Sequence, residues 1–200
     1  MQGRSYNSVI PNGVFVLLIA NGLMFAAQIQ VPIVNVILPL FPLDSGYFMP
    51  WQVATYGFLH ASPTHILFNM FGLWMFGSDV ERLMGTKRFL TYFMVCVVGA
   101  GIVQLIVGAM AGGDYPRTVG ASGGVFGILL AYGLAFPNRT VMLLFPPIPM
   151  KARTFVIVFG IFELFMGVSG RQPGVANFAH LGGMVFGYLL IRHWSKTRRR

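Results

Sequence analysis

Six long apolar segments, separated by short polar stretches, constrain this 200-residue chain more than any other feature. A helix needs about 20 mostly apolar residues to cross a hydrocarbon core of about 30 Å. Only 10% of the residues are charged, whereas an ordinary soluble domain has about 25%. We therefore predict an all-α, polytopic membrane protein with six transmembrane helices. They are expected at about Val14–Pro32, Pro63–Leu83, Phe89–Ala111, Ser122–Phe136, Phe155–Val168 and Asn177–Ile191.

Basic residues are distributed unevenly between the ends of these segments. Twelve lie at one set of alternate ends, and only Arg117 and Arg171 lie at the other, so both termini are expected in the cytoplasm. We interpret residues 1–200 as a single membrane domain with a short cytoplasmic N-terminus over 1–13 and a basic cytoplasmic tail over 192–200. A bacterial plasma membrane is favoured. The net charge of +9 suits contact with the lipid bilayer rather than nucleic acid, because no aromatic residues interleave with the basic ones.

Polar residues inside apolar segments are costly unless they face a cavity or a partner. At a rise of ~1.5 Å per residue, Ser122 and His180 lie about 21 and 17 Å from the cytoplasmic ends of their helices. Asn69 and His65, both in the second segment, lie about 17 and 23 Å from its end. A non-helical stretch over 112–120 precedes Ser122, and at membrane depth it needs protein or a water-filled cavity around it. Four polar side chains from three helices are therefore expected at one level.

Small residues give two of these helices a way to approach closely. Gly123 and Gly127 are spaced by four residues in the fourth segment, and Gly183 and Gly187 have the same spacing in the sixth. Such patterns allow membrane helices to pack backbone against backbone. We therefore expect Ser122 and His180 to lie near the contact between the fourth and sixth helices.

The polar residues at this level are those that acyl transfer requires. A serine needs a base, most often histidine, and donors must face the developing oxyanion. The backbone N–H of Ser122, together with His65 and Asn69, can supply those donors. Glu163 in the fifth segment is placed only about 12 Å above the start of its helix. No carboxylate is therefore expected at this level, and we predict a Ser122–His180 dyad that needs no cofactor.

Three motifs, taken together, resemble those of the rhomboid family of intramembrane serine proteases. They are Gly120-Ala121-Ser122-Gly123, then His60-(x4)-His65-(x3)-Asn69 in FLHASPTHILFNMFG, and Ala179-His180-(x2)-Gly183-(x3)-Gly187. The resemblance extends from about Trp51 to the sixth segment. It implies a six-helix bundle, a membrane-embedded loop between the first two spans and a lateral gate near the fifth helix.

The resemblance also implies a role for each matching residue. Ser122 would be the nucleophile, and His180 the general base and acid of a serine endopeptidase. His65, Asn69 and the Ser122 amide would form the oxyanion hole, and His60 matches a histidine with a structural role. The implied partners are single-pass membrane proteins, whose transmembrane segments would be cleaved.

The chain departs from the family pattern at two positions. Bacterial members often have Tyr four residues after the serine, and here Phe126 can still stack on the histidine but has no hydroxyl. The embedded loop often carries a Trp-Arg pair, and here the pair is Trp51-Gln52. The second departure removes an arginine from the anchoring of the loop.

Other interpretations remain open. A catalytically inactive rhomboid-like binder would recognise transmembrane helices without cleaving them, although the intact Ser122 and His180 argue against it. A small transporter would use Glu163 and the histidines as a proton path, although the absence of an internal repeat and the presence of the serine motif argue against it. A metal site is disfavoured because His60 and His65 are not four residues apart and no acidic residue or cysteine completes a zinc set. Glu163 could either influence gating by the fifth helix or fix that helix through a hydrogen bond.

Overall fold

The computed structural model describes residues 10–111, 116–142, 147–169 and 176–197. Within these ranges the chain forms eight α-helices, a 3₁₀-helix at Tyr56–Phe58 and a two-stranded antiparallel sheet. The helices are α1 (Asn12–Gln30), α2 (Val34–Ile37), α3 (Gln52–Thr55), α4 (Pro63–Met84), α5 (Thr86–Ala111), α6 (Ser122–Ala135), α7 (Ala152–Ser169) and α8 (Asn177–Thr197). The strands are β1 (Thr140–Met142) and β2 (Pro149–Lys151). The mostly helical fold predicted from the sequence is confirmed, and the small sheet was not predicted.

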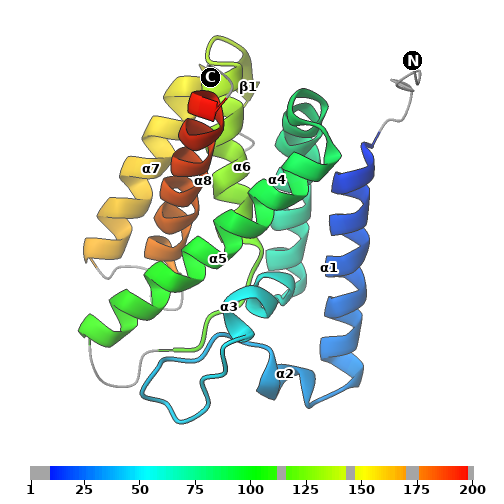
Figure 1. The fold of residues 1–200 in the computed structure, drawn as a ribbon, viewed down its shortest axis with the longest axis vertical. Coiled ribbons are helices and arrows are strands. Elements are labelled where there is room, and N and C mark those ends of the chain that lie inside the picture. The colour runs from blue at the N-terminus through cyan, green and yellow to red at the C-terminus, as the bar shows by residue number, and fades with distance from the viewer. Residues whose placement is uncertain (1–9, 112–115, 143–146, 170–175, 198–200) are drawn as a thin grey trace.

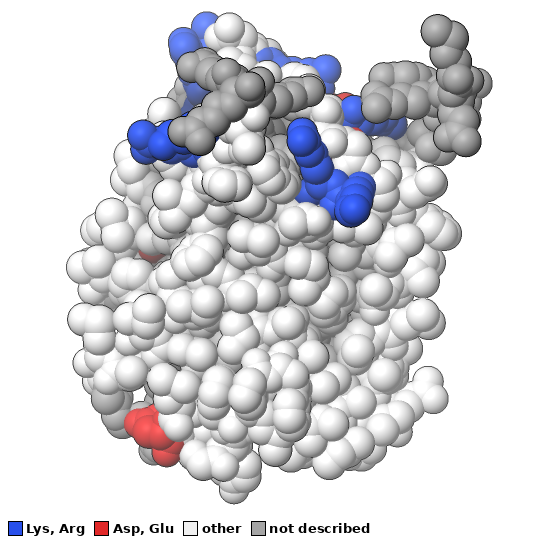
Figure 2. All heavy atoms as spheres, in the orientation of Figure 1, with Lys and Arg blue, Asp and Glu red and all other residues white. Residues whose placement is uncertain are grey.

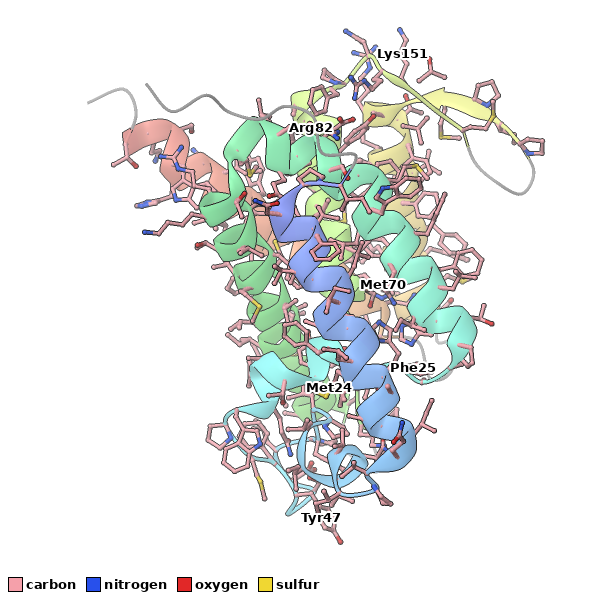
Figure 3. The ribbon with its side chains drawn as sticks, turned by 90° about the vertical axis from the view of Figure 1, so that its right-hand side faces the viewer. Met24, Phe25, Tyr47, Met70, Arg82 and Lys151 are labelled. Atoms are coloured by element: carbon pink, nitrogen blue, oxygen red, sulfur yellow. The ribbon has the colours of Figure 1, made fainter. Side chains whose placement is uncertain are left out.

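Each of the six predicted segments coincides with one long helix, either α1 or one of α4 to α8 (Figure 1). Over the described ranges, α1, α5 and α7 are long and apolar enough to cross a membrane, and α6 is a shorter apolar helix of 14 residues. Large apolar side chains are exposed on α1, α5 and α7, for example Leu23, Met110 and Ile161. The face drawn in Figure 2 carries few charged residues below the end of the molecule where Lys and Arg gather. Arg82 and Lys151 lie at that end in Figure 3.

Helix α6 lies inside the bundle, where it packs against α4, α5, α7 and α8. A Cβ atom on Gly183 would overlap the carbonyl oxygen of Gly123, and one on Gly127 would overlap the sulfur of Cys96. The same Cβ on Gly127 would lie 3.2 Å from the carbonyl oxygen of Gly183. The predicted close approach through small residues is therefore confirmed. It brings the first turn of α6 beside α8.

A buried glutamate joins α1 to the end of α4. The carboxylate of Glu81 accepts hydrogen bonds from the backbone N–H groups of Gly13 (2.8 Å) and Val14 (2.7 Å), at the start of α1. It also accepts one from the hydroxyl of Thr86 (2.6 Å), at the start of α5. The first N–H groups of a helix have no partner within the helix. Glu81 supplies partners for two of them and also compensates the positive end of the helix dipole.

The connection from α1 to α4 is anchored by a buried glutamine. The side chain of Gln52 donates to the carbonyl oxygens of Ile37 (3.3 Å) and Tyr47 (3.0 Å) and accepts from the N–H of Phe41 (3.3 Å). The indole N–H of Trp51 also donates to Ile37, at 3.0 Å. The Gln52 carboxamide therefore holds three points of the loop backbone at a position where the family often has an arginine.

Candidate active site

Ser122 is the first residue of α6, and the backbone before it has a conformation that only glycine adopts readily. Gly120 has φ +135°, and its N–H donates to the carbonyl oxygen of Tyr56 (3.0 Å). Just upstream, Thr118 and Leu40 exchange two backbone hydrogen bonds of 2.8 and 3.0 Å. These contacts fix the point at which α6 begins. The hydroxyl of Ser122 therefore stands at the positive end of a helix, next to backbone N–H groups that have no intrahelical partner.

The structure brings Ser122 and His180 into direct contact. Nε2 of His180 lies 2.8 Å from Oγ of Ser122, which is a hydrogen-bonding distance. Phe126, one turn further along α6, stacks on the imidazole with ring centroids 4.4 Å apart and an interplanar angle of 4°. The stacking expected of this phenylalanine is therefore observed. It fixes the plane of the His180 ring, whose Nε2 faces the serine.

His65 approaches the same point from α4. Its Nδ1 accepts a hydrogen bond from the N–H of Ala61 (3.3 Å), so the hydrogen of the neutral ring is assigned to Nε2, which becomes a donor. A Cβ atom on Gly120 would lie 2.9 Å from this Nε2 and 3.6 Å from Oγ of Ser122. The donor of His65 and the serine hydroxyl therefore flank the same small space.

Asn69 lies one turn beyond His65 on α4, buried at 6% exposure. Its side-chain nitrogen donates to the carbonyl oxygen of His65 (3.0 Å), which fixes the orientation of the amide. An amide nitrogen carries two hydrogens, and this bond uses one of them. Asn69 and His65 thus present a second pair of polar groups to the region in front of Ser122.

These four residues line one cavity between the helices. The cavity has a volume of about 1160 Å³ and is bounded by side chains from α4, α6, α7 and α8. Apolar residues such as Phe71, Met75 and Phe159 form much of its wall, and Ser122, His180, His65 and Asn69 supply polar groups. An apolar cavity with a few convergent polar groups is the usual form of a binding site.

The prediction that no carboxylate shares this level is wrong. Oε2 of Glu163, on α7, lies 2.9 Å from Nδ1 of His180, and it also accepts a hydrogen bond from the side chain of Asn177 (2.7 Å). The depth estimate failed because it measured each helix from its own predicted end, whereas α7 begins three residues earlier, at Ala152, and α8 ends six residues later, at Thr197. Measured from the observed helix ends, Glu163 stands about 17 Å from Ala152 and His180 about 26 Å from Thr197, so distances along separate helices do not give relative heights in the bundle. The acidic residue within an apolar segment was itself the signal for a functional contact.

His60 contacts His65 and makes no hydrogen bond to Ser122. It is buried, and its ring meets the ring of His65 edge-on, with centroids 5.1 Å apart. Its backbone N–H donates to the side chain of Gln28 on α1 (2.8 Å). Over the described part of the chain, no three His, Cys, Asp or Glu side chains come together in a way that could hold a metal ion.

The comparison with known families settles the relationship that the motifs indicated. A family model described as the Rhomboid domain matches residues 47–196, which include α3 to α7, nearly all of α8, and Ser122, His180, His65, Asn69 and Glu163. The chain belongs to the rhomboid family. Together with the apolar helices, this membership identifies an integral membrane protein.

Curated rhomboid relatives align with most of the chain. It is 29% identical to the rhomboid protease GlpG of Photorhabdus laumondii over 163 residues, which is 80% of this chain and 54% of the relative. It is also 29% identical to the rhomboid protease GlpG of Yersinia pestis over 152 residues, which is 76% of this chain and 50% of the relative. This rhomboid-family chain therefore spans about half the length of these curated relatives.

Proposed function

We propose that this chain is an intramembrane serine endopeptidase that cleaves transmembrane segments of other membrane proteins with a Ser122–His180 dyad. The observation that carries the proposal is the 2.8 Å contact between Ser122 Oγ and His180 Nε2, at the wall of a cavity within the bundle. A serine in contact with the acceptor nitrogen of a histidine is an activated nucleophile. Membership of a family that includes named proteases supports the same conclusion.

The proposed reaction has two halves. Ser122 Oγ attacks the carbonyl carbon of the scissile peptide while its proton passes to Nε2 of His180. The C–N bond then breaks, the proton passes from Nε2 to the leaving amine, and an acyl-enzyme remains. Water attacks that ester with His180 again as the base, which releases the new carboxyl end and restores the serine.

The oxyanion of each tetrahedral intermediate would be stabilised by preorganised donors. The backbone N–H of Ser122, Nε2 of His65 and the side-chain nitrogen of Asn69 are the candidates. His65 is the best supported of the two side chains, because its assigned Nε2 hydrogen faces the space beside Ser122 Oγ.

The proposed setting is a six-span bundle with both termini in the cytoplasm of a bacterial cell and single-pass membrane proteins as substrates. The six long helices and the gathering of basic residues at one end support this topology (Figure 2). The start of α1 and the end of α8 also lie at the same end of the bundle, which agrees with an even number of crossings (Figure 1).

The proposal is tested by cleavage in reconstituted lipid vesicles that contain a single-pass substrate. Ser122→Ala and His180→Ala should each lower kcat by about 10³-fold or more, because the reacting pair is lost. Ser78→Ala is the matched control, since Ser78 is a helical serine whose hydroxyl donates to the carbonyl oxygen of Trp74. Cleavage that survives Ser122→Ala would contradict the proposal. Binding of the substrate segment by wild type without cleavage would favour an inactive binder.

A further inference from the structure

The carboxylate of Glu163 touches the nitrogen of His180 that does not face the serine. We propose that Glu163 is a positioning residue, which fixes the tautomer of His180 so that Nε2 is free to accept the proton of Ser122. The inference rests on the proposed roles of Ser122 and His180. It adds to them a third group, on a helix that carries neither.

The argument begins with the two nitrogens of the imidazole. A neutral ring carries one hydrogen, and the nitrogen that carries it cannot accept another. Nε2 of His180 can act as a base only when the hydrogen is on Nδ1. A carboxylate is an acceptor without a hydrogen of its own, so Oε2 of Glu163, 2.9 Å from Nδ1, selects the tautomer that leaves Nε2 free.

Stacking alone could not make this selection. Phe126 lies parallel to the ring at 4.4 Å, so it fixes the plane of the imidazole. A ring turned over within that plane, or one with its hydrogen on Nε2, would keep the same stacking contact. A polar partner on the far edge of the ring is needed to distinguish these states.

Glu163 is itself held in place. The side chain of Asn177, the first residue of α8, donates to the same Oε2 at 2.7 Å. Two donors thus converge on one oxygen, which suits a carboxylate that accepts both. Asn177 and His180 are three residues apart on one helix, so they approach the carboxylate from the same face.

The position of Glu163 also excludes direct action on a substrate. Its carboxylate is buried at 6% exposure and is not among the groups that line the cavity, whereas His180 is. It therefore acts through the histidine. When His180 takes the proton from Ser122, the imidazolium that forms lies beside a negative charge in surroundings of low polarity, where their attraction is strong.

The first test is the variant Glu163→Gln, measured in vesicles with a single-pass substrate. Gln has nearly the same shape but can present an N–H to Nδ1, which would move the ring hydrogen to Nε2. We expect kcat to fall by about 10²- to 10⁴-fold with little change in KM, because no substrate contact is altered. Glu81→Gln is the matched control, since it changes a second buried glutamate that lies away from the cavity. It should keep a near wild-type kcat per folded molecule.

The second test reads the tautomer directly and does not depend on activity. In wild type labelled with ¹⁵N-histidine, the His180 signal, assigned by its loss in His180→Ala, should show hydrogen on Nδ1. In Glu163→Gln it should show hydrogen on Nε2. Hydrogen on Nε2 in wild type would overturn the inference even if the variant does not fold.

The two proposals fail in distinguishable ways. If Ser122→Ala is inactive but Glu163→Gln retains full kcat, the positioning role is wrong and the proposed function stands. If Ser122→Ala still cleaves, the proposed function is wrong, and the role of Glu163 in the reaction is wrong with it.

Discussion

Two buried glutamates lie in different parts of this molecule and have different partners. Glu81, 3% exposed, accepts two backbone N–H groups and a hydroxyl where α1, α4 and α5 meet. Glu163, 6% exposed, accepts from the side chain of Asn177 and lies in hydrogen-bond contact with Nδ1 of His180, beside the cavity. The partners of Glu81 connect helices and do not titrate, whereas the partners of Glu163 include the imidazole of His180, which can take up and release a proton. The partners of a buried carboxylate, rather than its burial, therefore indicate its role.

The largest difference in kcat between the region of the cavity and the region of Glu81 should come from replacing a glycine with alanine in each. In Gly120→Ala the new Cβ would lie 2.8 Å from Cε1 of His65, at a φ of +135° that alanine rarely adopts. Either the ring of His65 or the backbone at residue 120 must move to accommodate the methyl group, and both movements displace the site. We therefore expect kcat to fall by about 10²-fold, as a shift of about 1 Å can cause. Gly85→Ala, at φ +81° near Glu81 with nothing within 4 Å of the new Cβ, is the control. It should lower stability and leave kcat unchanged, and equal kcat values for the two variants would contradict the comparison.

Glu81→Gln should affect stability rather than catalysis. The amide keeps one acceptor oxygen for three donors, so at least one buried donor loses its partner. The expected cost in unfolding free energy is about 1–3 kcal/mol. Unfolding in mixed micelles, followed by circular dichroism, measures it. The comparison fails if the variant is as stable as wild type but loses kcat.

Asn177→Ala should have an intermediate effect on the site. It removes the side-chain N–H that donates to Glu163, while the contact of the carboxylate with His180 remains. A hydrogen bond is worth about 0.5–1.5 kcal/mol, which corresponds to a fall in kcat of about 2- to 12-fold. Initial rates at saturating substrate give the value. A loss as large as that of Glu163→Gln would mean that Asn177 has a role of its own.

Thr86→Val should have the smallest effect. It removes the hydroxyl that donates to Glu81 at 2.6 Å and keeps the shape of the side chain. We expect about 0.5–1.5 kcal/mol less stability and an unchanged kcat. The same unfolding experiment measures it, and a kcat change of more than twofold would show that the Glu81 region influences the site.

The residues that meet at the cavity could be predicted because their signals are local in the sequence. The motif around Ser122, the spacing of His65 and Asn69 and the glycines beside His180 are each read within a few residues. Apolar length located the six helices in the same way. The stacking of Phe126 follows from its position one turn after the serine.

The contacts that sequence analysis missed depend on geometry between distant segments. Distances along separate helices, each measured from its own end, do not show how the helices are offset or tilted, so they separated Glu163 from His180, whose side chains touch. The contact between Glu81 and Gly13 joins residues 68 positions apart, and no local pattern connects them. The strands β1 and β2 have three residues each, too few to show the alternation of a strand.

The most direct measurement of the proposed chemistry is the site of covalent labelling by a fluorophosphonate, which a nucleophilic serine attacks with loss of fluoride. The protein is labelled in lipid vesicles and the adduct is located by mass spectrometry of its peptides. We predict a single adduct on Ser122 that disappears in His180→Ala and persists in Ser78→Ala. An adduct on another residue, or labelling of Ser122 that does not depend on His180, would contradict the proposed dyad.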